Sequence, residues 1–274
     1  MNTYLERLAP LFAVLATLAI AGPAAAADWA PAASAPIHPG VNTTTEGGSC
    51  TANFVFTNGS DVLIGQAAHC SSTGEATETD GCTSVSRPEG TPVTVDGASE
   101  PGTLVYNSWI RMQQRGESDA DTCAYNDFAL VKLSAADAAK VNPSIPFWGG
   151  PTGLADSVGV GKKVLSYGNS VLRQGITALS PKEGISIVED GGGWNHGVET
   201  VTPGIPGDSG SAFIDKQGKA FGVLSTLQLA PIPTANGVGD LSRELAYAQS
   251  FGDFSGLQLA TGTEPFRGPL LPLP

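Results

Sequence analysis

The sequence has 274 residues, a formal net charge of −12 and only 15% charged residues, with 35 Gly and 20 Pro. Its acidic balance, without a cluster of Lys or Arg, argues against a nucleic-acid partner, because phosphate contacts need basic residues. The Gly and Pro content lies below the range of disordered chains and is typical of many short strands joined by tight turns, in one large domain or two small ones.

Residues 1–27 have the pattern of an export signal. Arg7 gives a short positive region, residues 8–22 are mostly apolar, and Ala25 and Ala27 fit an A-x-A cleavage site. A retained N-terminal anchor is the alternative, but the apolar run is short for a bilayer span. We therefore predict a secreted protein with no membrane association after this segment is removed.

Short strands are predicted from residue 47 onward, after an Ala-, Pro- and Thr-rich stretch at 28–46 that suggests a loosely ordered arm. Residues 52–57 are apolar and β-branched, Asn58-Gly59 favours a tight turn, and residues 62–64 resume the apolar run. This hairpin leads directly to His69. Further strands are predicted at 91–95, 102–106 and 128–133, which makes residues 47–133 the first β unit.

Composition changes at residues 134–153, which are Ala-rich and then rich in Pro and Gly, so we predict a connection between two lobes. Residues 154–261 form the second β unit, with a late helix capped by Asp240 and stopped at Gly252, and residues 262–274 form a Pro-rich tail. The pattern is that of an antiparallel all-β protein, plausibly with two barrels. Strands of the second unit are predicted at 163–166, 184–188, 198–202, 211–214 and 220–226.

Four cysteines follow the signal segment: Cys50, Cys70, Cys82 and Cys123. An even number in an oxidising compartment indicates two disulfides, with three possible connectivities. No CxxC pair is present, so we predict neither a zinc site nor any other metal or cofactor.

The segment Pro206-Gly207-Asp208-Ser209-Gly210 contains the candidate nucleophile, Ser209. Flanking glycines allow a sharp turn that exposes the hydroxyl and lets the Gly207 and Ser209 N–H groups point at one spot, where an oxyanion would form. The alternative is an ordinary Gly-rich surface turn.

A serine nucleophile needs a base, usually histidine, and a carboxylate that orients the base. The sequence has three histidines, His38, His69 and His196. His69 follows an apolar strand in the segment AAHC, which makes it the candidate base. Asp127 begins an apolar strand in the segment NDFALV. A buried carboxylate there would be energetically costly unless it interacted with a partner, which makes Asp127 the candidate acid. The alternatives are a structural histidine beside a disulfide and a capping aspartate. His196 lies in a Gly-rich stretch, so we expect an exposed loop residue; a substrate contact is the alternative.

Together the motifs AAHC, NDFALVKL and PGDSGS, in this order, resemble those of the trypsin/chymotrypsin family of serine proteases, which read T-A-A-H-C, N-D-I-A-L-x-x-L and G-D-S-G-G. The Cys50–Cys70 spacing is similar to that of the secreted bacterial, streptogrisin-like branch, where such a pair forms a disulfide. Cys82 and Cys123 are then left to pair, for stability alone or to steady the catalytic aspartate's loop. The resemblance covers roughly residues 47–226.

The resemblance implies two antiparallel six-stranded β-barrels with the active site in the cleft between them. The late helix predicted above adds a short C-terminal helix to this all-β fold. The resemblance also implies an endopeptidase in which Ser209 attacks the scissile carbonyl, His69 shuttles the proton and Asp127 orients His69. The Gly207 and Ser209 amides would form the oxyanion hole of an acyl-enzyme mechanism. The expected partner is a protein or peptide substrate, and the enzyme is expected to be a monomer.

Two departures from the family pattern concern activation and specificity. No I-V-G-G-like segment precedes residue 47, so Asp208 needs another partner or stays hydrated; Arg173 is the candidate, and we predict activity without a cleavage switch. Pro203 and Gly204 stand where tryptic members carry the pocket aspartate, which predicts non-tryptic specificity.

The segment from Val223 to Leu227 resembles the strand that lines the family's substrate channel. This resemblance predicts that Ser225 is one of the substrate-binding residues. Leu227 stands where the family usually has Gly, so it would narrow the mouth of the pocket and favour small or apolar side chains, or close the pocket.

Other classes fit less well. An α/β-hydrolase needs G-x-S-x-G and a histidine after the serine, and neither is present. A subtilisin-like enzyme needs its aspartate before its histidine and a parallel sheet. A catalytically silent binding protein on the same scaffold is the remaining alternative, against which the complete triad argues.

Overall fold

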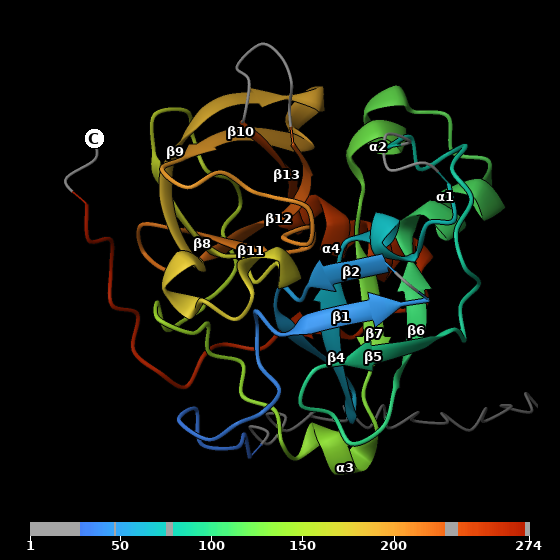
Figure 1. The fold of residues 1–274 in the computed structure, drawn as a ribbon. Coiled ribbons are helices and arrows are strands. Elements are labelled where there is room, and N and C mark those ends of the chain that lie inside the picture. The colour runs from blue at the N-terminus through green and yellow to red at the C-terminus, as the bar shows by residue number, and fades with distance from the viewer. Residues whose placement is uncertain (1–27, 47, 75–78, 228–234, 272–274) are drawn as a thin grey trace, which may run out of the picture.

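The computed structural model describes residues 28–46, 48–74, 79–227 and 235–271 (Figure 1). The predicted signal segment, residues 1–27, lies outside the described part. Within that part, no helix is both long and apolar enough to cross a membrane.

The strands form two antiparallel sheets, which lie on the two sides of the molecule in Figure 1. The first half of the chain contributes most of an eight-stranded sheet in the order β14-β3-β4-β7-β6-β5-β1-β2, and the second half closes into a barrel in the order β10-β13-β12-β11-β8-β9. The strands of the first sheet are β1 (Asn42–Thr45), β2 (Gly48–Thr51), β3 (Val55–Asn58), β4 (Asp61–Gln66), β5 (Pro92–Val95), β6 (Gly102–Asn107), β7 (Ala129–Lys132) and β14 (Leu257–Leu259). The strands of the barrel are β8 (Lys163–Tyr167), β9 (Pro181–Asp190), β10 (Asn195–Thr200), β11 (Ala212–Asp215), β12 (Ala220–Leu227) and β13 (Asn236–Asp240).

The predicted all-β class and the closed six-stranded second barrel are confirmed. The first half differs in detail, because the described strands make a longer sheet with β2 and β14 at its two ends. β14 comes from the C-terminal region, which the sequence places in the second β unit, but it pairs with β3 of the first sheet, with Gln258 opposite Thr57. No local signal in a three-residue strand reveals such a distant partner.

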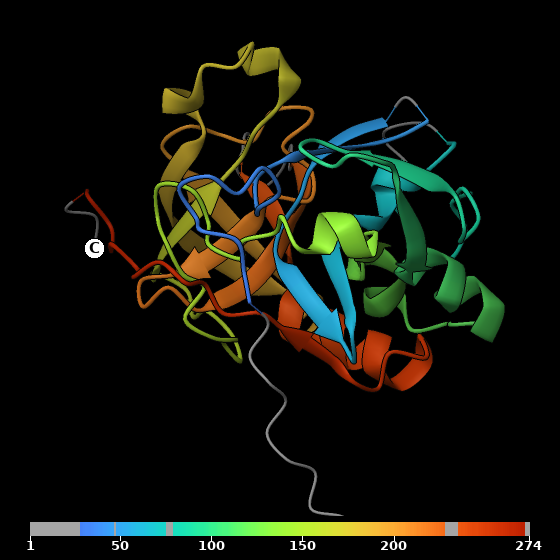
Figure 2. The same cartoon turned by 90° about the horizontal axis from the view of Figure 1, so that it is seen from below.

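The first and last parts of the described chain, residues 28–46 and 260–271, contact the body of the protein. Ile37 and Val41 in the predicted loose arm are buried, and β1 begins within that arm, so the expectation of loose order at residues 28–46 was wrong. The C-terminal segment runs from β14 back to the barrel (Figure 2). There the Leu271 N–H donates to a carboxylate oxygen of Glu183 at 2.8 Å. Burial of apolar side chains against the sheet explains why the arm is fixed despite its Pro-rich sequence.

The predicted C-terminal helix is present as α4 (Leu241–Phe251), with Asp240 as its N-cap and Gly252 after its last turn. The sequence reading missed α1 (Ser108–Arg115), in which Asn107 caps the start and Gly116 adopts φ +66° at the end. The remaining short helices are α2 (Ala120–Tyr125), α3 (Ala135–Ala138), η1 (Ala68–Ser71), η2 (Val171–Arg173), η3 (Thr177–Leu179) and η4 (Gly191–Gly193).

One apolar cluster joins the two halves. It contains Phe54 and Phe128 from the first half, Val223 from the barrel, and Leu241 and Leu245 from α4. Because such a shared core resists relative motion, residues contributed by the two halves keep a fixed separation.

Candidate active site

His69 lies in the turn η1, directly after strand β4. The Cys50–Cys70 disulfide ties this turn to β2, and the Asn107 amide donates to the Ala68 carbonyl at 3.0 Å. The backbone is therefore held on both sides of His69, whose side chain remains 24% exposed. The ring is fixed but reachable from solvent.

Asp127 holds His69 through two contacts. One carboxylate oxygen lies 2.7 Å from Nδ1 of the imidazole, and the other accepts the His69 backbone N–H at 2.9 Å. A third group, the Ser225 hydroxyl of β12, donates to Asp127 Oδ2 at 2.5 Å. The buried carboxylate thus orients the ring so that Nε2 points away from Asp127.

The pKa values of both groups reflect this pairing. Burial alone would lower the pKa of His69, but the Asp127 charge and hydrogen bond outweigh it and raise the pKa above the ordinary value of 6.5. For Asp127, burial opposes ionisation, yet the interactions with His69 and Ser225 lower its pKa. The aspartate therefore stays charged at neutral pH.

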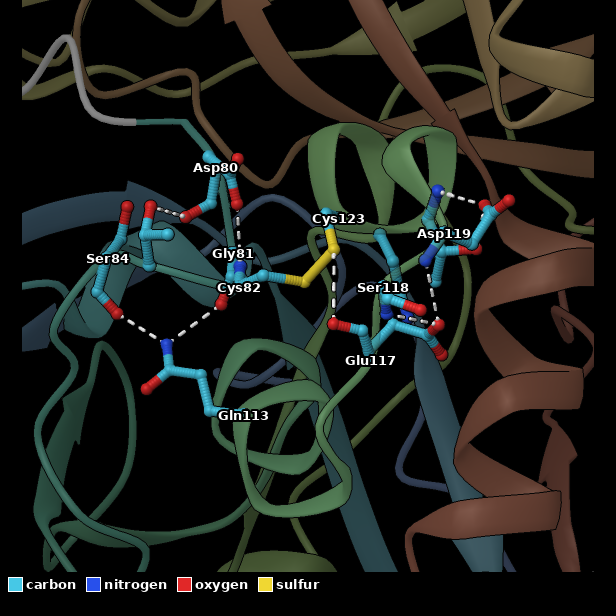
Figure 3. Close-up of a disulfide and its surroundings, with 12 residues drawn as sticks. Asp80, Gly81, Cys82, Ser84, Gln113, Glu117, Ser118, Asp119 and Cys123 are labelled. Carbon is cyan, nitrogen blue, oxygen red and sulfur yellow. Dashed lines mark hydrogen bonds between the residues drawn. A yellow bond between two sulfur atoms is a disulfide. The ribbon is translucent and has the colours of Figure 1, made fainter.

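The second predicted disulfide lies close to the aspartate in sequence. Cys82 is bonded to Cys123 of α2, the helix that ends two residues before Asp127 (Figure 3). The start of this helix is capped by Asp119, which accepts the Thr122 N–H at 2.8 Å. The approach to the aspartate is therefore held by a covalent bond and by a helix cap.

Ser209 lies in the loop between β10 and β11, beside the segment that leads to His69. Gly207 and Gly210 on either side have φ values of +95° and +85°, which favour glycine. A Cβ on Gly210 would lie 2.6 Å from the Thr51 carbonyl oxygen and 3.0 Å from the Ala67 nitrogen, so only glycine permits this approach. The side-chain hydrogen bond of His69 goes to Asp127, and none reaches Ser209 within the described residues.

Among residues 207–211, two backbone N–H groups have no acceptor within the described part of the structure. Those of Asp208, Gly210 and Ser211 donate to carbonyls, whereas those of Gly207 and Ser209 have no acceptor in the described part of the chain. Two free donors separated by one intervening residue could both point at a developing oxyanion.

Asp208 is fully buried between two cations. The Arg173 guanidinium contacts both of its carboxylate oxygens, with Nη2 2.6 Å from Oδ2, and Lys182 Nζ lies 3.3 Å from Oδ2. Burial opposes ionisation, but the Arg173 hydrogen bond and the Lys182 charge lower the pKa of Asp208. Arg173, the candidate partner from the sequence, therefore does contact Asp208. Lys182 was not identified from the sequence, because a single lysine in a strand belongs to no recognisable motif.

The four residues predicted to bind substrate differ in exposure and in hydrogen bonding. Pro203 is exposed, whereas Gly204 is buried and donates its N–H to Asn236 Oδ1 at 3.0 Å. Ser225 directs its hydroxyl to the aspartate, and the side chain of Leu227 lies outside the described part. Asn236, which pairs with Leu227 across β12 and β13, was not identified from the sequence.

The expectation of an exposed loop histidine at position 196 was wrong. His196 is fully buried on β10, and its Nε2 lies 2.9 Å from Asp240 Oδ2, at the N-cap of α4. The preceding glycines form the short turn η4, so the strand begins at Asn195, and His196 faces the same side as buried Val198. The Gly-rich composition had suggested a longer loop.

The described residues that could bind a metal ion by type and proximity fall into two groups, each with a disulfide at its centre: Cys50 and Cys70 beside His69, and Cys82 and Cys123 beside Asp80. A disulfide sulfur is not a thiolate ligand, so neither group is suited to zinc.

No protein-family model matches the sequence, and no curated protein matches it. Solved structures do match the fold. Thermobifida fusca protease A is 18% identical, with 82% of this chain and 99% of that chain covered, at a TM-score of 0.53. A glutamic acid-specific serine protease, described as using a histidine triad in substrate binding, is 17% identical, with 82% and 100% covered, at a TM-score of 0.52. The chain therefore has the fold of bacterial chymotrypsin-like serine proteases.

Proposed function

We propose that the protein is a serine endopeptidase with His69, Asp127 and Ser209 as its catalytic triad. The observation that carries the proposal is the Asp127–His69 pair, in which a buried, charged carboxylate fixes a partly exposed imidazole beside the Ser209 loop. The other histidine that is paired with an aspartate, His196, is fully buried, whereas the His69 ring is partly exposed and can be reached by a substrate.

In the proposed mechanism Ser209 attacks the scissile carbonyl carbon while His69 Nε2 accepts the hydroxyl proton. Asp127 stabilises the resulting imidazolium, and the free N–H groups of Gly207 and Ser209 bind the oxyanion. His69 then returns the proton to the leaving amine, which leaves an acyl-enzyme that water hydrolyses. The hydrogen bond from Ser209 to His69 would form on substrate binding, as is common for catalytic pairs.

The buried Asp208 cluster supports activity without a cleavage switch. Arg173 and Lys182 already neutralise the carboxylate next to the nucleophile, so no new N-terminus is required to do so. Two donors from the loop backbones, the N–H groups of Ser170 and Ile205, complete its hydrogen bonding at 3.1 Å each. We infer that the mature chain folds directly into its active form.

Non-tryptic specificity is the second part of the proposal. Pro203 and Gly204 carry no charge, and the neighbouring buried side chain, Asn236, is neutral, so a basic substrate side chain would find no carboxylate there. Leu227 would restrict the pocket to small or apolar side chains.

We further infer that the protein is secreted. The two disulfides support an oxidising compartment, and residues 1–27 have the composition of an export signal.

Labelling with a fluorophosphonate probe tests the enzymatic proposal. Wild-type protein should form an adduct on Ser209 that is absent in Ser209→Ala and is formed far more slowly in His69→Ala. Ser250→Ala, which removes an exposed hydroxyl on α4, is the matched control and should label like wild type. Folded wild-type protein that forms no adduct would instead indicate a catalytically silent binding protein.

A further inference from the structure

A buried carboxyl group from α4 contacts the backbone of Asp127. Glu244 is fully buried, and its Oε1 accepts the Asp127 N–H at 3.4 Å. The side chain of Asp127 meanwhile points to His69 and Ser225. The catalytic aspartate is thus held by its carboxylate on one side and by its main chain on the other.

Space for this carboxyl group depends on a glycine. A Cβ on Gly239 of β13 would lie 2.4 Å from Glu244 Oε1. The glycine therefore lets the barrel wall close around the carboxyl group, which indicates a built site rather than a chance burial.

No cation within the described part of the chain forms an ion pair with Glu244, and its Oε2 has no hydrogen-bond partner there. The ionisable groups around it are Asp127, Asp240 at the N-cap of α4, and Tyr106 of β6. Burial, with the charges of Asp127 and Asp240, raises the pKa of Glu244 well above that of an ordinary glutamate. A neutral acid is far less costly in these surroundings than an unpaired buried charge.

We propose that Glu244 is a positioning residue, kept as a neutral carboxylic acid, that fixes the main chain of Asp127 and thereby the Asp127–His69 hydrogen bond. This inference rests on the proposed function and deepens it. A neutral acid accepts the Asp127 N–H without placing a second negative charge behind the triad. A displaced Asp127 would interact less with His69, and the pKa of His69 would fall.

The experiment is an NMR titration of the His69 ring in wild-type protein and in variants, which requires no activity. In Glu244→Leu, which keeps the volume but removes the acceptor, the pKa of His69 should fall by about half a unit or more. Glu244→Gln keeps a neutral acceptor and should keep the pKa of His69 near the wild-type value. Leu245→Ala, a neighbouring buried position on α4, is the control that weakens packing without removing this acceptor, and it should leave that pKa unchanged.

Infrared spectroscopy supplies a second readout, a protonated carboxylic acid band at pH 7 that disappears in Glu244→Gln. The proposal is overturned if Glu244→Leu titrates like wild type, if Glu244→Gln is as perturbed as Glu244→Leu, or if the band is missing. Failure of the proposed function appears separately, as wild-type protein that does not react with fluorophosphonate while these titrations still report on Glu244.

Discussion

Thr51 and Ser209 are joined by a backbone hydrogen bond between the two halves of the molecule, in which the Thr51 N–H donates to the Ser209 carbonyl at 2.8 Å. The Thr51 hydroxyl also donates to the Gly207 carbonyl at 2.8 Å and accepts the Asn169 N–H at 3.1 Å. Thr51 directly follows Cys50, whose disulfide partner is next to His69. One residue of β2 therefore connects the segments of His69 and Ser209, the proposed base and nucleophile.

Replacement of Thr51 by Val should weaken both stability and activity. The change removes a buried hydroxyl with two partners, which should lower the free energy of unfolding by about 1–3 kcal/mol. It should also lower kcat/KM, because the Gly207 carbonyl loses its donor. The matched control is Thr43→Val, since the Thr43 hydroxyl is buried without a partner among the described residues; that variant should be neutral or more stable. Equal losses in the two variants would contradict the assigned role of Thr51.

Activity should depend on pH through His69. The base works only as the neutral ring, so kcat/KM should fall as pH decreases through the pKa of His69, which Asp127 raises above 6.5. Replacement of Asp127 by Asn removes the charge that raises this pKa, so the acidic limb should move to lower pH while kcat falls by roughly 10⁴-fold. The measurement is the profile of kcat/KM from pH 5 to 9 for the wild type and for Asp127→Asn. An acidic limb at the same pH in these two proteins would argue against the proposed effect of Asp127 on His69.

Replacement of Arg173 should lower the free energy of unfolding much more than replacement of an exposed arginine. Arg173→Met removes the bidentate partner of a buried carboxylate, for which about 3–5 kcal/mol of unfolding free energy is expected. Arg87→Met breaks an exposed pair with Glu46 and should cost about 1 kcal/mol or less. Because the folded-state pKa of Asp208 is lowered, its contribution to stability is present above about pH 4 and is lost as pH falls through that lowered value. Urea denaturation of both variants at pH 7, and of wild type toward acid pH, tests these expectations.

Removal of the Cys82–Cys123 disulfide should affect stability rather than catalysis. The double change to Ser should lower the free energy of unfolding by about 3–4 kcal/mol, because it frees a loop in the unfolded chain. The value of kcat should not change at temperatures well below the melting transition, because the Asp119 cap and the Ser108 hydroxyl still hold the chain around Asp127. A lower kcat in the fully folded double variant would show instead that the disulfide steadies the aspartate.

The features that were predictable from the sequence are those encoded by adjacent residues. The Asn58-Gly59 hairpin and the Asp240-capped helix are present because turn and cap chemistry act locally. The His69–Asp127 contact joins residues far apart in the chain, and it was expected only through the family resemblance. The burial of His196 and the position of Lys182 were not predictable, because each depends on partners supplied by other strands. The burial of Glu244 was not predictable either, because a glutamate in a helix is normally exposed.

The pairing of β14 with β3 has a consequence for the order in which the molecule can be completed. Leu259 lies opposite Phe56, about two hundred residues earlier in the chain, so this edge of the first sheet cannot form until residues 257–259 have been synthesised. Contacts of such long range slow folding and delay the final assembly. The β3 edge of the first sheet is therefore expected to stay unpaired until β14 has been made and can dock onto it.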